Sequence, residues 1–99
     1  MSSYVLAFRG RPDRTPQPGE EEAWGAWVGR LGPVIAEFGH RTGTSRMVSA
    51  EQGGSLDGRV LTGYIVITAE DLDAAVDLAS GCPGLAHQVS VEVAEVIAS

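Results

Sequence analysis

The stretch GRVLTGYIVITAEDLDAAVDLASGCPG, residues 58–84, decides the fold because it contains a strand followed directly by a helix. Residues 59–69 are rich in β-branched and aromatic residues, which predicts a strand. Its apolar side chains alternate between two faces: Leu61, Ile65 and Ile67 on one, and Val60, Tyr64 and Val66 on the other.

The helix that follows is predicted to begin at Thr68, whose hydroxyl can cap it, with Asp71 at the capping-box spacing. Gly81 and Pro83 are expected to end this helix. Its predicted buried stripe consists of Leu72, Ala75, Val76 and Ala79.

Three further elements are predicted outward from this pair. Residues 3–10 alternate as a strand, and residues 11–20 hold three prolines and therefore form a loop. Apolar residues recur at helical spacing through residues 20–40, so we expect one long helix, kinked at Pro33. Residues 44–50 and 87–98 are expected to be strands, with a Gly-rich turn at 51–58.

The resulting order is β-α-β-β-α-β in a single α+β domain of 99 residues. With right-handed crossovers this is the ferredoxin-like arrangement, an antiparallel four-stranded sheet with both helices on one face. Those helices cover only one face of strands that are apolar on two, and soluble monomers rarely expose such a patch. We therefore expect a homodimer through the sheet face. The alternative is that residues 9–19 or the C-terminal tail cover this face.

Composition narrows the function classes. The net charge is −6 with no Lys, so nucleic-acid binding is not expected. The N-terminus is not that of a signal peptide and no apolar run is long enough for a membrane span, so we expect a cytoplasmic protein. The lone Cys82 excludes an internal disulfide, and the two histidines have no metal-site spacing, so neither a metal nor a cofactor is expected.

Three segments together resemble the YCII-related family, especially its DGPF-type members: AWGAWVGRLGPVIAEFG, GYIVITAEDLDAAVDLASGCPG and VSVEVAEV. The resemblance implies a dimeric α/β barrel. The Asp-Gly-Pro-Phe signature is replaced by Glu-Gln-Gly-Gly at residues 51–54. The histidine that enzymatic members carry at the start of the first helix has no match at residues 22–24, whereas His87 matches a position where DGPF-type members often carry histidine.

Candidate catalytic residues are His40 and His87 as general bases, with Glu51 or Asp57 as the partner carboxylate. The structural alternatives are a helix C-terminal cap for His40 and a solvated turn for His87. Candidate ligand-binding residues are aromatic or cationic: Trp24, Trp27, Tyr64, Arg9 and Arg46. The alternative for Trp24 and Trp27 is that they are ordinary residues of the hydrophobic core. The alternative for the arginines is that they form solvated or intersubunit ion pairs.

Three functions are compatible with these residues. The first is a protein that binds a small apolar or aromatic molecule in a cleft between helix and sheet. The second is a cofactor-independent lyase or isomerase that uses a His/carboxylate pair. The third is a regulatory protein-interaction module that acts through acidic helix surfaces. We rank them in this order.

Overall fold

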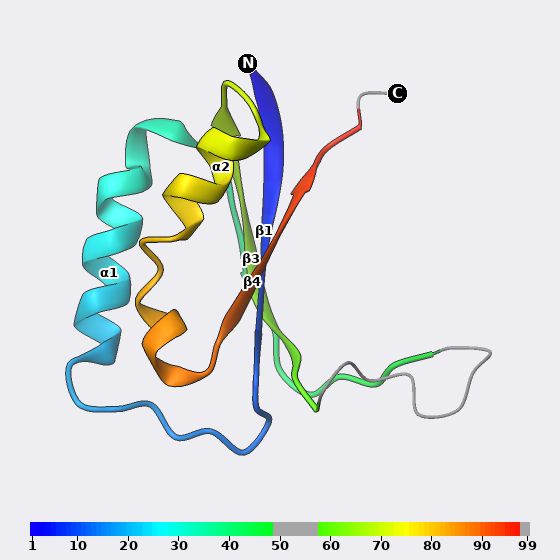
Figure 1. Ribbon diagram of the computed structural model, residues 1–99. Helices are drawn as coiled ribbons and strands as arrows, with labels where there is room; N and C mark the ends of the chain where they lie inside the picture. The colour runs from blue at the N-terminus through cyan, green and yellow to red at the C-terminus, as the bar shows by residue number, and fades with distance from the viewer. Residues whose placement is uncertain (49–57, 98–99) are drawn as a thin grey trace.

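One antiparallel sheet, ordered β2-β3-β1-β4, organises the chain in a computed structural model that describes residues 1–48 and 58–97. The elements are β1 (Ser2–Gly10), α1 (Glu20–Leu31), the 3-10 turn η1 (Gly32–Val34), β2 (Ile35–Arg41), β3 (Val60–Ala69), α2 (Leu72–Ala79), the 3-10 turn η2 (Pro83–His87) and β4 (Ser90–Glu95). Both helices lie on the same side of the sheet (Figure 1). The α+β class and the element order are confirmed, and the arrangement is compatible with a ferredoxin-like fold.

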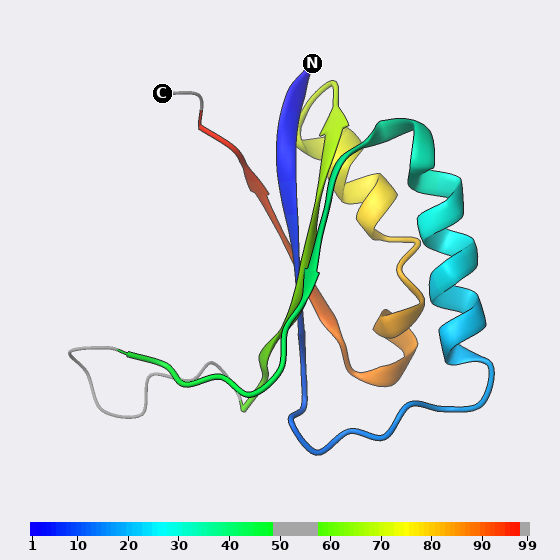
Figure 2. The same ribbon diagram turned by 180° about the vertical axis from the view of Figure 1, so that it is seen from behind.

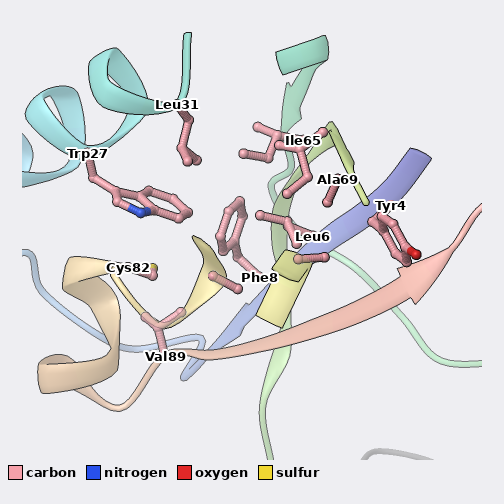
Figure 3. Packing of buried hydrophobic residues seen from close by; sticks show 12 residues of the cluster. Tyr4, Leu6, Phe8, Trp27, Leu31, Ile65, Ala69, Cys82 and Val89 are labelled. Carbon is pink, nitrogen blue, oxygen red and sulfur yellow. The ribbon is translucent and has the colours of Figure 1, made fainter. Parts of the chain in front are cut away.

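The central strands β1 and β3 show the predicted alternation. Val5 pairs with Val66 and Leu6 with Ile65, so Val5 and Val66 share one face of the sheet and Leu6 and Ile65 share the other. Toward the helices these strands bury Tyr4, Leu6, Phe8, Ile65, Ile67 and Ala69. Trp27 and Leu31 from α1 and Ala75 and Ala79 from α2 close over them, as Figure 3 shows for most of this cluster. The core therefore lies between the helices and one sheet face.

The first helix is shorter than predicted. It ends at Leu31, and the second strand is Ile35–Arg41, not residues 44–50. Gly32 and Pro33 form a tight 3-10 turn, after which Ile35 pairs with Ile67 of β3. Residues 44–48 contain no helix or strand, and the rest of the predicted strand lies outside the described residues. The helical prediction is wrong after Leu31 because Val34 and Ile35 also pack on the core from the turn and the strand.

The second helix also differs from prediction at its start. Asp71 is the N-cap, and its carboxylate accepts a 2.8 Å hydrogen bond from the Ala74 amide. Thr68 lies in β3 instead, and its hydroxyl donates to the Val34 carbonyl at 3.4 Å. Of the predicted stripe, Ala75 and Ala79 are buried, whereas Leu72 and Val76 are 50% and 43% exposed. The final strand is shorter than predicted, since His87 belongs to η2.

The other sheet face carries no described helix (Figure 2). Register places two rows across its centre, Glu37–Val66–Val5–Ala94 and His40–Tyr64–Ala7–Glu92. Val5, Ala7, Tyr64 and Val66 are half-buried by their neighbours on the sheet, and the outer residues of both rows are exposed. We call the side chains of these two rows the open face. It is apolar at its centre and polar at most of its border. Among the described residues, no helix is long and apolar enough to cross a membrane.

Candidate functional site

A cleft of about 900 Å³ opens between α1 and the β2–β3 half of the sheet. Its floor is the beginning of β3, and its end is the Pro-rich loop that joins β1 to α1. Trp24 and Val28 of α1 form one wall, and residues 38–41 of β2 form the other. The volume is typical of pockets that bind small molecules.

Three aromatic rings support the α1 wall. Phe8 meets Trp24 edge-to-face at 5.1 Å between ring centroids, and Trp24 meets Trp27 at 5.8 Å in the same geometry. Trp27 is only 2% exposed, and its indole N–H donates to the Leu78 carbonyl of α2 at 3.2 Å. Trp27 therefore holds the two helices together in the core, while Trp24 lines the cleft. Edge-to-face packing fixes the plane that Trp24 presents to the cleft.

Glu20 is a buried carboxylate at the end of the cleft, with 4% of its surface exposed. Both carboxylate oxygens accept from the Arg14 guanidinium. One oxygen also accepts from the Gln17 amide at 3.1 Å, and the other from the Trp24 indole N–H at 3.3 Å. The side-chain hydrogen bonds from Arg14 lower the pKa of Glu20 to about 2. We call these four residues the Glu20 cluster. It fixes the Pro-rich loop to the first turn of α1.

The edge strand β2 has a bulge where it borders the cleft. Glu37 pairs with Val66 and His40 with Tyr64, so β2 has one residue more than β3 between these pairs. Gly39 adopts φ +64°, and a Cβ there would lie 2.0 Å from the Tyr64 carbonyl oxygen. Only glycine fits this approach. The bulge leaves Phe38 70% exposed beside the cleft and packs the His40 ring against Tyr64, at 6.1 Å between centroids.

The cleft has cations at one end. Arg11, Arg14 and Arg41 line it, together with the acidic Glu20 and Glu21. Arg14 is paired with Glu20. Within residues 1–48 and 58–97, Arg11 and Arg41 take part in no ion pair. The end of the cleft near the Pro-rich loop is therefore more positive than the protein as a whole, whose net charge is −6.

Of the predicted site residues, Trp24 lines the cleft from α1, whereas His40 and Tyr64 border it from strand positions whose side chains belong to the open face. His40 lies on β2 and not at a helix end. His87 is half-buried at the end of η2 and does not line the cleft. Arg46 is exposed and lies on no strand, contrary to the prediction. Glu51 and Asp57 lie outside the described residues.

Arg9 points to the side of the sheet opposite the helices, two positions along β1 from Ala7 of the open face. Its Nη2 lies 3.5 Å from Glu92 Oε1, and its Nε is buried with no hydrogen-bond partner among the described residues. Cys82 is 4% exposed, and burial raises the pKa of its thiol, so it has the character of a core residue. In the described part of the chain, no three His, Cys, Asp or Glu side chains are grouped as metal ligands.

Sequence reasoning missed Arg14, Glu20, Phe38 and Arg41 as residues of the site. Glu20 is the first of three consecutive glutamates in the first turn of α1, where acidic residues of any kind interact favourably with the helix dipole. What distinguishes Glu20 from the other two glutamates is Arg14, which lies six residues earlier in a Pro-rich loop that can turn back on the helix. Phe38 and Arg41 were missed because they were assigned to the helix or its end.

Comparisons with known proteins add no assignment: no family model matches the chain, and no curated protein matches it. The resemblance to the YCII-related family therefore remains a prediction from the residues quoted above.

Proposed function

We propose that this chain is a YCII-related protein that binds a small molecule in the cleft between α1 and β2–β3. The observation that carries the proposal is the cleft itself, about 900 Å³ in volume and walled by Trp24, Val28 and Phe38. Phe38 is a large apolar side chain at the edge of the cleft, and it is 70% exposed. A bound apolar molecule would remove Phe38 and the Trp24 ring from water, which is favourable by about 25 cal/mol for each Å² of apolar surface buried.

A cofactor-independent enzyme is the second candidate, favoured by His40. This histidine borders the cleft, and its ring packs on Tyr64 in a row of the open face, so an imidazole and a phenol lie side by side there. Both groups can transfer protons. The proposed partner carboxylates, Glu51 and Asp57, lie outside the described residues, so binding is the function we propose first.

A thermal-shift screen with aromatic and other apolar metabolites tests the binding proposal. Val28→Trp should obstruct the cleft beside Trp24 and reduce the stabilisation by any ligand that binds there. Ala26→Trp is the matched control, because Ala26 is exposed on the same helix and does not line the cleft. The proposal fails if no compound stabilises the protein, or if Val28→Trp leaves the stabilisation unchanged.

We also propose that two copies associate through the open face to form a dimeric α/β barrel. Val5, Ala7, Tyr64 and Val66 supply an apolar centre. No described helix covers this face, and soluble monomers rarely leave an apolar sheet face uncovered.

Light scattering after size exclusion tests the association. We expect a dimer of about twice 10.4 kDa, and we expect Val66→Asp to give a folded monomer. Val76→Asp places the same charge on the exposed surface of α2 and should leave the dimer intact. A wild-type monomer at micromolar concentration would contradict the proposal.

A further inference from the structure

We propose that the ligand of the cleft is an organic anion with an apolar, ring-containing body and a carboxylate, which Arg11 and Arg41 bind. This inference rests on the proposed binding function and specifies its ligand class.

The distribution of charge gives the first reason. The chain has seven Lys and Arg residues, all of them Arg, against thirteen acidic residues. Three of the seven arginines line this one cleft. The Glu20 cluster neutralises Arg14, so Arg11 and Arg41 remain, opposed only by Glu21 among the acidic side chains of the lining. A local positive field in an acidic protein attracts an anion to this site.

Chain topology gives the second reason. The strands β1 and β2 are both antiparallel to β3 and therefore run in the same direction. Arg11 directly follows β1, and Arg41 is the last residue of β2, so both arginines lie at the same end of the sheet. Figure 1 shows these two strand ends on the side of the molecule where the Pro-rich loop leads to α1. Arg41 pairs with Gly63, on the sheet face that the helices cover. One anionic group at the end of the cleft would therefore meet both guanidinium groups.

The lining gives the third reason. Beyond the cations, the cleft is walled by Trp24, Phe38 and Val28, which suit a flat or compact apolar body. Two of the hydroxyl groups at the cationic end already donate to backbone carbonyls, from Thr42 to Leu61 at 2.9 Å and from Thr62 to Phe8 at 3.2 Å. The charged donors left for the ligand are the Arg11 and Arg41 guanidinium forks, which match the two oxygens of a carboxylate. The predicted ligand is thus an amphipathic acid with its charge toward Arg11 and Arg41.

Matched pairs of acids and neutral amides test this assignment: benzoate with benzamide, cinnamate with cinnamamide, and 2-naphthoate with 2-naphthamide. Isothermal titration calorimetry of the full chain measures each dissociation constant. We expect each acid that binds to do so at least about tenfold more tightly than its amide, which corresponds to about 1.4 kcal/mol. Arg41→Gln and Arg11→Gln should each reduce this preference to less than about threefold. Arg30→Gln is the matched control, since Arg30 is exposed on α1 outside the cleft and its loss changes the net charge equally.

The possible results separate the two proposals. Acids and amides that bind equally well would overturn the carboxylate assignment and leave the binding function intact. Failure of every acid and every amide to bind would contradict both. Tighter binding of 2-naphthyl phosphate than of 2-naphthoate would replace the carboxylate by a phosphate ester and overturn the assignment. A preference for acids that persists in both Arg11→Gln and Arg41→Gln would refute the role given to these residues. Circular dichroism of each variant shows whether its fold is retained.

Discussion

Replacing Glu20 by Gln tests whether the Glu20 cluster holds the end of the cleft by charge. Gln has the same shape, and its carbonyl oxygen can still accept from the Gln17 amide or the Trp24 indole. The variant loses the ionic bond to Arg14. The pKa of Glu20 is lowered from 4.5 to about 2 in the folded protein. At about 1.4 kcal/mol per pH unit, this corresponds to about 3 kcal/mol of stability. Because Arg14 keeps some contact with water, we expect about 2–3 kcal/mol at pH 7.

The sign of the pH dependence follows from the lowered pKa. Above pH 4.5, Glu20 is ionised in both states, and its full contribution to the free energy of unfolding is present. Between pH 4.5 and about 2 the unfolded chain takes up a proton that the folded chain does not, so the contribution falls as the pH falls. By this linkage, about 1 kcal/mol is lost at pH 4 and about 2 kcal/mol at pH 3.

Urea denaturation followed by tryptophan fluorescence measures this at pH 7, 5, 4 and 3, at one protein concentration throughout because association would change the apparent stability. The difference between wild type and Glu20→Gln should be largest at pH 7 and small at pH 3. Glu22→Gln is the control: it is exposed in the same first turn of α1 and should change stability by less than about 1 kcal/mol. A difference between wild type and Glu20→Gln that is equal at pH 7 and pH 3 would refute the charge-based explanation.

Three further substitutions, two of them with a control variant, test the packing around the site by the same denaturation measurement. Gly39→Ala should lower the free energy of unfolding by more than about 2 kcal/mol, because of the left-handed backbone and the contact with the Tyr64 carbonyl. Gly29→Ala, which has open space at its Cβ, should raise it by up to about 1 kcal/mol. Equal effects of the two substitutions would contradict the bulge geometry. Leu6→Ala, at a fully buried position, should cost about 2–5 kcal/mol, and the half-exposed Leu72→Ala clearly less. Trp27→Phe should lose the hydrogen bond to Leu78 together with some packing, at a cost of about 1–3 kcal/mol; no loss would mean that this bond does not hold the helices together.

The central strands could be predicted because period-2 alternation is a local signal. Residues 59–69 differ by one residue from the observed β3, and the opposite faces of Ile65 and Val66 are as predicted. The second helix was predicted in the right part of the chain, but its start was placed at Thr68 instead of after Asp71, and its buried stripe was too wide. Leu72 and Val76 have helical spacing, yet an eight-residue helix lying on a twisted sheet buries only the small Ala75 and Ala79. How wide a buried stripe is depends on the neighbouring elements, which local periodicity does not contain.

The cleft could be predicted only in part, for the same reason. Trp24 was identified because an aromatic side chain on a helix can face either core or ligand. The distinction between Trp24 and Trp27 depends on α2, whose Leu78 carbonyl accepts from Trp27 and so keeps it in the core. Arg41 and Arg11 lie thirty positions apart in the sequence, and only the parallel course of β1 and β2 brings them to one end of the sheet.

The error in the first helix and the incomplete prediction of the cleft have one physical origin. A helix continuing to residue 40 would leave no β2, and the cleft would have no second wall. Instead, Gly32 and Pro33 end the helix at Leu31. The Thr68 hydroxyl of β3 then donates to the Val34 carbonyl, and Ile35 pairs with Ile67 at the start of β2. Gly39 then permits the bulge that presents Phe38 at the cleft. The glycines and the proline that weaken a helix by their intrinsic propensities are therefore the residues that create the binding site, and Gly39→Ala should impair ligand binding as well as stability.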